Sequence, residues 1–275
     1  METNDQVEAR LEKLTRLREM GINPYPYRFP LTHDSAALTA AREELLASNQ
    51  IVAFAGRIVR YNIKGKIAFI HLKDGAGRLQ VMFGRDAVGE ASFELVKMLD
   101  IGDWIGVHGP MFVTKTGEYS VKAEKVELLS KALRPLPIPK EKIENGEKLI
   151  FDEFKDVETR YRQRYVDLTL NDPVRDTFLK RSRVLQAIRE YLIGQSYLEV
   201  ETPVLQPIYG GANARPFSTH HNALDIPLFL RVSNELYLKR CIVGGFPKVF
   251  EFAKDFRNEG IDRTHNPEFT LLEFY

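Results

Sequence analysis

The feature that most constrains the fold is a pair of strand-forming segments near residue 275. Residues 249–259 and 269–275 are both rich in aromatic and β-branched side chains, which favour β-strands. The polar residues 260–267 join them, and this loop is longer than the roughly 2–5 residues that usually close a hairpin. We therefore expect two antiparallel strands with a long connection, and long polar loops on rigid strands often carry function.

The side chains of these two segments sort by face. Because neighbouring side chains of a strand point to opposite faces, Arg257 and Glu259 are expected on one face of the first strand. Phe269, Glu273 and Tyr275 should share a face of the second strand, so that charge and two aromatic rings gather there. An ordinary half-exposed sheet shows the same alternation, so the pattern by itself allows both a binding site and a solvated polar face.

Composition narrows the class of protein. The 275 residues are enough for two domains, and a hydrophobic content of 44% is ordinary for a soluble globular protein. The net charge of +1 gives no overall attraction to nucleic acid, although residues 51–135 hold 13 Lys and Arg against 9 Asp and Glu. The polar first residues and the lack of an apolar run of about 18 residues predict no signal peptide and no membrane partner. The single cysteine, Cys241, is expected as a small apolar residue of a helix, which fits a reducing cytoplasm.

The N-terminal half predicts a helical extension followed by a β-barrel. Residues 5–20 have apolar residues at helical spacing that ends at Gly21, so residues 1–50 are expected to form a helical extension. Residues 51–134 contain five short strands with a helix before the fourth, which is typical of an OB-fold barrel; another small β-barrel is the alternative. The expected strands are residues 51–61, 67–73, 77–83, 103–114 and 118–128, and the expected helix is residues 93–98.

A change of composition marks the next boundary. Alternating prolines in residues 134–139 favour an extended spacer, so residues 135–165 are interpreted as a linker. Residues 166–275 are then expected to form a second domain.

The second domain should open with a long helix and a strand. Asp172 and Pro173 predict a helix start, because an acidic cap followed by a first-turn proline is typical of helix N-termini. The helix is expected to end at Gly194, and the alternating residues 197–202 should form a strand that Pro203 stops. Ordinary packing of a helix on a strand would leave the same pattern.

Several sequence runs resemble class II aminoacyl-tRNA synthetases. The triplet Arg257-Asn258-Glu259, followed by residues 265–270 and 273–275, is similar to motif 2 of that class, and the segment that Pro203 ends is similar to motif 1. The resemblance covers nearly the whole chain. Three more runs are similar to the lysyl-tRNA synthetases of the bacterial type: Gly210–Phe217, Thr219–Asp225 and Glu235–Arg240.

This resemblance implies an α+β fold, with an OB-fold anticodon-binding barrel followed by part of an antiparallel class II catalytic domain. It implies a lysine–tRNA ligase that uses lysine, ATP and tRNA(Lys), and a homodimer formed through motif 1. Two other functions stay open. One is a binding module that holds tRNA without catalysis, and the other is an aspartyl- or asparaginyl-tRNA synthetase of the same architecture.

The resemblance assigns five residues to ATP. Arg257 is implied as the catalytic residue, gripping the α-phosphate and the substrate carboxylate. Glu259 and Asn266 would meet the adenine, His265 would approach the terminal phosphates, and Phe269 would stack on the base. The alternative is a surface role for the four polar residues and a core role for Phe269.

The resemblance also implies a lysine site. A desolvated ammonium needs an opposite charge and hydrogen-bond acceptors. Glu235 and Tyr275 are implied to hold the side-chain ammonium, Glu273 and the backbone of Gly211 the α-amino group, and Arg257 the carboxylate. Alternatively, Glu235 is a first-turn residue that the helix dipole favours. The two glutamates argue against an acidic substrate, which would need a cation in the site.

In the barrel, Phe69, Gln80 and Glu118 match positions that read the anticodon in this family. Unstacked bases would lie on the aromatic ring while the amide and the carboxylate read their edges. Solvent-exposed barrel residues are the alternative. The family's basic residue near the first turn falls on Tyr61, with Arg60 beside it.

Two further features depart from the family pattern. Asn234 stands where proline is usual and Ser196 where glycine is usual, and both are interpreted as neutral changes. Motif 3, with a second arginine for ATP and the Mg²⁺ carboxylates, would lie beyond Tyr275. We therefore expect no metal ligands in the chain, and expect residues 1–275 alone to bind tRNA without forming lysyl-adenylate.

Overall fold

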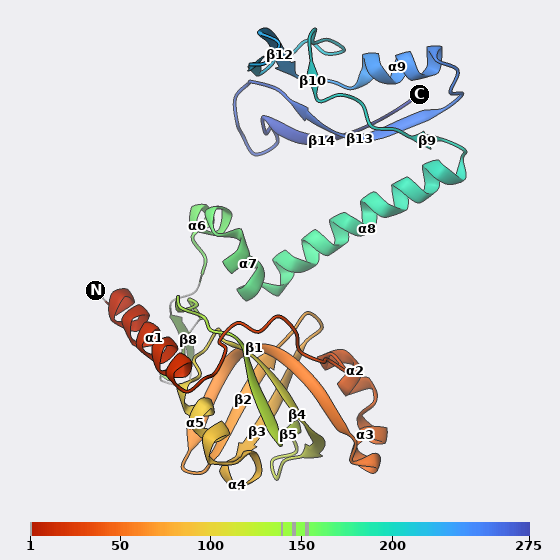
Figure 1. Cartoon of the computed structure of the whole chain (residues 1–275). Helices are drawn as coiled ribbons and strands as arrows, with labels where there is room; N and C mark the ends of the chain where they lie inside the picture. The colour runs from red at the N-terminus through yellow and green to blue at the C-terminus, as the bar shows by residue number, and fades with distance from the viewer. Residues whose placement is uncertain (1, 139, 145–146, 152–153) are drawn as a thin grey trace. The chain divides into compact units, whose positions relative to one another are not determined.

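The computed structural model divides the chain into two compact units, residues 1–170 and residues 171–275 (Figure 1). The domain boundaries predicted after residues 50, 134 and 165 stay predictions. The residues that the structure describes are 2–138, 140–144, 147–151 and 154–275.

The first unit is built on a closed barrel, as expected. The strands are ordered β1-β2-β3-β5-β4-β6, and an additional β1–β4 pairing closes the barrel. Its interior is filled by large apolar side chains that include Phe54, Phe83 and Phe93, all fully buried. The elements are β1 (Ile51–Lys64), β2 (Ile67–Lys73), β3 (Arg78–Gly84), α4 (Arg85–Val88), α5 (Glu90–Met98), β4 (Trp104–Val113), β5 (Tyr119–Ala123) and β6 (Lys125–Ser130).

One predicted strand of the barrel was wrong, because residues 118–128 form two strands, β5 and β6, instead of one. Strand β5 pairs with β3 and with one part of β4, while β6 pairs with the other part of β4. At Gly109, β4 changes partner from β6 to β5, and the two backbones come very close there. A Cβ on Gly109 would lie 1.9 Å from the carbonyl oxygen of Lys122. Pro110 follows and has no N–H for the ladder. The resulting irregularity lets β5 turn toward β3 and close the barrel.

Helices precede the barrel. Helix α1 (Glu2–Glu19) is the predicted N-terminal helix; Leu14 and Leu17 on it are buried, and Gly21 follows with a φ of +74°. Helix α2 (Ser35–Ala40) begins at Asp34, whose carboxylate accepts a hydrogen bond from the Ala37 N–H as an N-cap. Helix α3 (Arg42–Ser48) leads into β1.

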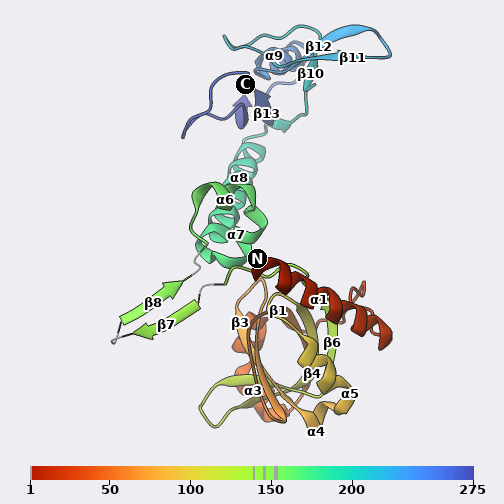
Figure 2. The same ribbon diagram turned by 90° about the vertical axis from the view of Figure 1, so that its left-hand side faces the viewer.

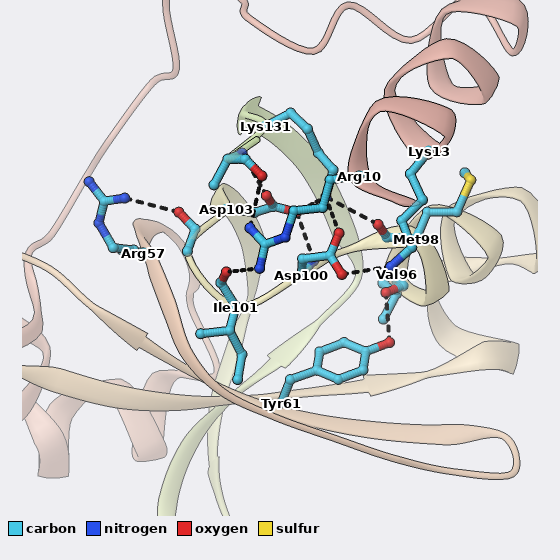
Figure 3. Close-up of polar contacts among 12 residues, drawn as sticks. Arg10, Lys13, Arg57, Tyr61, Val96, Met98, Asp100, Ile101, Asp103 and Lys131 are labelled. Carbon is cyan, nitrogen blue, oxygen red and sulfur yellow. Dashed lines mark hydrogen bonds and ion pairs between the residues drawn. The ribbon is translucent and has the colours of Figure 1, made fainter. Parts of the chain in front are cut away.

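A cluster of charged residues ties α1 to the barrel (Figure 3). The fully buried ammonium of Lys131 lies 2.5 Å from an Asp100 oxygen and 2.7 Å from an Asp103 oxygen. From α1, Lys13 contacts the other Asp100 oxygen at 2.6 Å, and Arg10 donates to the carbonyls of residues 101 and 132 at 3.0 and 2.9 Å. Burial favours a raised pKa for Asp100, but its hydrogen bonds with Lys13 and Lys131 outweigh burial and lower the pKa below its ordinary value.

The region predicted as a linker holds more structure than expected. Residues 131–138 have no helix or strand, as predicted for the proline-rich spacer, while residue 139 and parts of 145–153 lie outside the described residues. Strands β7 (Lys140–Glu144) and β8 (Glu147–Phe151) then form an antiparallel pair, which Figure 2 shows in side view. Helices α6 (Val157–Arg162) and α7 (Arg164–Leu170) follow.

The second unit contains two small sheets and two helices. Its strands form a sheet in the order β14-β13-β9 and a second sheet in the order β10-β12-β11. The predicted α+β class is therefore observed. Among the described helices, none combines the length and the apolar character needed to span a membrane. The elements are α8 (Asp172–Gly194), β9 (Leu198–Glu199), β10 (Leu205–Gln206), β11 (Ser218–His221), β12 (Ile226–Leu230), α9 (Glu235–Val243), β13 (Val249–Phe256) and β14 (Glu268–Phe274).

Two strand predictions need correction in this unit. The expected strand 197–202 is reduced to β9, because the Thr202 N–H and hydroxyl donate to the Glu251 carboxylate instead of a ladder. Strand β13 ends at Phe256, so Arg257 and Glu259 lie in the following loop and not on a strand face. The Arg257 N–H still donates to the Pro267 carbonyl at 2.8 Å, which holds this residue beside the sheet.

Candidate active site and nucleic-acid interface

One face of the β13–β14 pair gathers three carboxylates and an aromatic ring. In the antiparallel register, Glu251 stands opposite Glu273 and Asp255 stands opposite Phe269. Because residues two apart along a strand share a face, these four side chains lie on one side of the sheet. Three carboxylates on one face need cations or hydrogen-bond donors to be stable there.

Buried Arg231 supplies that compensation, and sequence reasoning missed it. Its guanidinium donates to a Glu251 oxygen at 2.9 Å and to the Thr202 carbonyl at 3.0 Å. Glu251 is 4% exposed and also accepts a hydrogen bond from the Asn234 amide at 3.1 Å. Burial favours a raised pKa for Glu251, but the hydrogen bonds from Thr202, Asn234 and Arg231 outweigh burial and lower the pKa. No local pattern in the sequence marks Arg231, because its partners lie 20 to 29 residues away.

Asp255 is held differently. The nitrogen Nε of Arg231 lies 3.2 Å from an Asp255 oxygen, but its hydrogen is directed to the Lys254 carbonyl. Both carboxylate oxygens of Asp255 are therefore buried without a hydrogen bond. Burial, together with the charges of Glu251 and Glu273, raises the pKa of Asp255 to about 6.

Arg257 and Phe269, both predicted to bind ATP, lie together. The guanidinium carbon of Arg257 is 5.0 Å from the centroid of the Phe269 ring. The nitrogen Nε of Arg257 is buried without a partner. The pair offers a cation and an aromatic ring side by side, the combination that a nucleotide needs for its phosphate and its base.

The other three predicted ATP residues lie in the exposed loop between β13 and β14. Asp262 organises this loop by accepting from the backbone N–H groups of Thr264 and His265, and it lies 2.7 Å from the His265 ring. These hydrogen bonds lower the pKa of Asp262. Asn266 donates to the Glu268 carbonyl at 2.8 Å, and Glu259 is exposed. Their predicted roles stay predictions.

The predicted lysine-site residues converge at the start of α9. A Cβ on Gly211 would lie 3.1 Å from the Glu235 Cβ, so the glycine lies directly against the first residue of the helix. Tyr275 donates from its hydroxyl to a Glu273 oxygen at 2.6 Å. Burial raises the pKa of Tyr275, and the carboxylates of Glu273 and Glu235 raise it further. Two carboxylates and a phenol therefore lie close together, as an ammonium site requires.

The barrel has its own cavity, of about 890 Å³, on the surface of β2 and β3. All three residues predicted to read the anticodon line it: Phe69, Gln80 and Glu118. Arg60 lines it as well, whereas the Tyr61 hydroxyl donates to the Val96 carbonyl at 2.9 Å. Arg60 and Lys115 are thus the basic residues that line this cavity, and Tyr61 does not line it.

A hydrogen-bond network fixes the polar groups of this cavity. One Glu118 oxygen accepts from Gln80 Nε2 at 2.6 Å, and the other lies 2.9 Å from His71 Nε2. Ser120 donates to Gln80 Oε1 at 2.9 Å, which sets the orientation of the amide. His71 was not predicted, although it lies two residues after Phe69 on the same strand face and is the register partner of Gln80.

Comparison with known proteins agrees with both parts of this description. The family of tRNA synthetases class II (D, K and N) matches residues 156–275. The family of OB-fold nucleic acid binding domains matches residues 52–129.

Individual relatives point to one enzyme within that class. The lysine–tRNA ligase of Christiangramia forsetii is 51% identical over 279 residues, which cover 99% of this chain and 48% of the relative. The lysine–tRNA ligases of Bacillus subtilis and Enterococcus faecalis are 49% and 50% identical, and the matches cover 54% and 53% of those relatives. The chain spans about half the length of the curated relatives that it matches. Over nearly its whole length, the chain is therefore similar to lysine–tRNA ligases, and its second half matches the class II tRNA synthetases (D, K and N).

Proposed function

We propose that this protein takes part in the ATP-dependent activation of lysine and its transfer to tRNA(Lys), in the cytoplasm. The observation that carries the proposal is the convergence of Gly211, Glu235, Glu273 and Tyr275, beside a sheet whose loop holds Arg257 against Phe269. Most of the buried polar atoms without a hydrogen bond among the described residues belong to this region, at Asn234, Asp255, Arg257 and Glu273. Such atoms are rare in folded proteins and fit a surface that completes its hydrogen bonds with a ligand.

In this reaction the protein residues form no covalent bond with the substrates. The lysine carboxylate, already ionised near neutral pH, attacks the α-phosphorus of ATP, an acyl–phosphate bond forms, and pyrophosphate leaves. Catalysis then consists of positioning and of stabilising negative charge. Arg257 would contact the α-phosphate and the substrate carboxylate, and Phe269 would stack on the adenine.

Magnesium is the expected companion of ATP in this reaction. Among the described residues, no group of three or more His, Cys, Asp or Glu side chains is arranged to hold a metal ion. The Glu251 carboxylate accepts from Arg231, and one oxygen of Glu273 accepts from Tyr275. No step of the proposed chemistry is therefore assigned to a metal held by these residues.

The test of the lysine site is Glu235→Gln in a complete enzyme that includes motif 3, measured by lysine-dependent exchange of labelled pyrophosphate into ATP. The change removes one charged partner of the ammonium and leaves Arg257 and Phe269 in place. The lysine concentration needed for half-maximal exchange should rise roughly 30-fold or more, which corresponds to a loss of about 2–5 kcal/mol of binding free energy. The ATP concentration needed should stay the same.

The matched control for that test is Glu158→Gln. Glu158 is also a first-turn glutamate with a basic partner one helical turn later, Arg162, but it belongs to α6. This control should leave both requirements unchanged. An unchanged lysine requirement in Glu235→Gln would remove Glu235 from the site and make it an ordinary helix-end residue.

We also propose that the barrel cavity binds the anticodon of tRNA(Lys). If a base stacks on Phe69, Phe69→Ala should weaken binding of a lysine anticodon stem-loop by about 1–3 kcal/mol, roughly fivefold to 150-fold. Tyr27→Ala is the matched control, since Tyr27 is a fully exposed aromatic residue that does not line the cavity. Equal affinities of Phe69→Ala and the unmodified protein would exclude Phe69 from the interface.

The homodimer implied by motif 1 is likewise a proposal. Helix α8 leaves several apolar side chains exposed, and burying them against a second copy of the chain would remove an apolar surface from water. Sedimentation of the protein at several concentrations would test this, and a monomer throughout would refute it. The exposed residues are Phe178, Leu179, Val184, Tyr191 and Ile193.

A further inference from the structure

The first turns of helix α9 hold an ion pair inside the proposed lysine site. The ammonium nitrogen of Lys239 lies 2.5 Å from a carboxylate oxygen of Glu235. The same nitrogen lies 5.4 Å from the centroid of the Tyr275 ring. Glu235 and Tyr275 are the two residues proposed to hold the side-chain ammonium of the substrate.

Lys239 carries the same chemical group as that substrate. Its primary ammonium, on a four-carbon chain, contacts a carboxylate and the face of an aromatic ring, as the proposed ligand would. A glutamate and a lysine four residues apart often pair on a helix surface. Such a pair needs no contact with another element, whereas Tyr275 directly follows β14 and lies 36 residues further along the chain.

We propose that Lys239 is an internal competitor of lysine: in the free protein its ammonium occupies the position of the substrate's side-chain ammonium, and it moves aside when lysine binds. This inference rests on the proposed lysine site. Two ammonium groups within a few ångströms repel each other, so both cannot contact Glu235 without loss. The side chain of Lys239 is 52% exposed, so it can leave into water, and an exposed ion pair of this kind is weak.

The arrangement also favours ligands with an ammonium group. A ligand that displaces Lys239 must offer Glu235 a replacement cation, because an unpaired and partly buried carboxylate is unfavourable. Lysine offers one. Norleucine, which has the same four-carbon side chain but no terminal ammonium, does not.

The experiment is calorimetric titration of the protein with L-lysine, L-norleucine and ATP, using Lys239→Gln and Lys239→Arg. Lys239→Gln removes the competing charge, so lysine should bind about fivefold more tightly, the effect of roughly one like charge at about 4 Å in water. Lys239→Arg keeps the charge and should bind lysine as the unmodified protein does. The affinities for norleucine and ATP should be unchanged in both variants, whereas a structural change in α9 would alter those affinities as well.

Two further variants separate this inference from the proposed function. Arg162→Gln breaks a similar ion pair on α6 and should leave lysine binding unchanged. If Glu235→Gln abolishes lysine binding while Lys239→Gln binds lysine as before or more weakly, the lysine site stands and the competitor role of Lys239 is refuted. If Glu235→Gln leaves lysine binding intact, the lysine site itself is refuted, and the role of Lys239 with it.

Discussion

The buried cation of the barrel offers the sharpest test of what stabilises the first unit. Lys131 has no exposed side-chain surface, and its ammonium contacts Asp100 at 2.5 Å, Asp103 at 2.7 Å and the Met98 carbonyl at 3.4 Å (Figure 3). Lys131→Met keeps the length and the apolar stem but removes the charge. Two carboxylates then lose a cation in a site where water does not replace it.

Removing one partner of a buried ion pair costs about 3–5 kcal/mol. Asp100 keeps Lys13 as a partner, and Asp103 keeps the backbone N–H groups of residues 100 and 132, so the lower part of this range is expected. For a unit of this size, about 3–4 kcal/mol corresponds to a fall in melting temperature of roughly 6–16 °C.

Trp104 makes the measurement specific. It is the single tryptophan of the chain and lies in β4, so its fluorescence reports on unfolding of the barrel alone. The control is Lys97→Met, which breaks an exposed Lys97–Glu94 ion pair and should cost at most about 1 kcal/mol.

The pH dependence of this stability difference tests whether its origin is electrostatic. Because the folded pKa of Asp100 lies below its ordinary value, its ion pairs stabilise the protein above pH 4 and are lost as the pH falls through the folded pKa. In Lys131→Met, Asp100 loses one of the two cations that lower its pKa and protonates more easily, so the difference from the unmodified protein should shrink between pH 7 and pH 4. A loss below about 1 kcal/mol, or a loss that does not change with pH, would refute an electrostatic origin.

Two more predictions concern the second unit. Asp255→Asn should change the pH dependence of stability. Because the folded pKa of Asp255, about 6, exceeds the ordinary value, the unmodified protein loses stability as the pH rises from about 4 to about 6. Over that window, urea unfolding should show the free energy of unfolding of the variant rising relative to that of the unmodified protein. A constant difference across those pH values would contradict the assignment. Ser196→Gly should stabilise the unit by up to about 1 kcal/mol, because Ser196 has a φ of +65°, which glycine adopts without strain. Thermal unfolding followed by circular dichroism measures this, and destabilisation would show that the serine side chain contributes more than its backbone strain costs.

Elements with a regular pattern could be predicted from the sequence. Residues 67–73 form a short, mainly apolar run between two glycine-containing turns, and the observed strand β2 has those bounds. Gly21 was predicted to end the first helix, and its φ of +74° is one that glycine adopts readily. Prediction from the sequence failed where the structure of one segment depends on contacts with a distant segment of the chain. The division of residues 118–128 into β5 and β6 follows from the close approach of Gly109 to Lys122, which no local pattern shows.

The candidate sites were predictable to a similar extent. Residue type and resemblance pointed to Glu235, Glu273 and Tyr275, and the structure brings these residues together. The supporting groups could not be predicted in this way. From the sequence, Arg231 is an ordinary charged residue after a strand, although it is 3% exposed and binds residues of two separate segments, Thr202 and strand β13.

The supporting groups also explain why Asn234 is not a neutral departure. Arg231 and Thr202 hold the Glu251 carboxylate, and Glu251 in turn accepts a hydrogen bond from the Asn234 side chain at 3.1 Å. Asn234 is the N-cap residue of α9, and the next residue is Glu235. A proline at this position would have no side-chain donor for Glu251. The buried ion pair beneath the sheet therefore fixes the start of α9, and through it the position of the carboxylate on which the proposed choice of lysine depends.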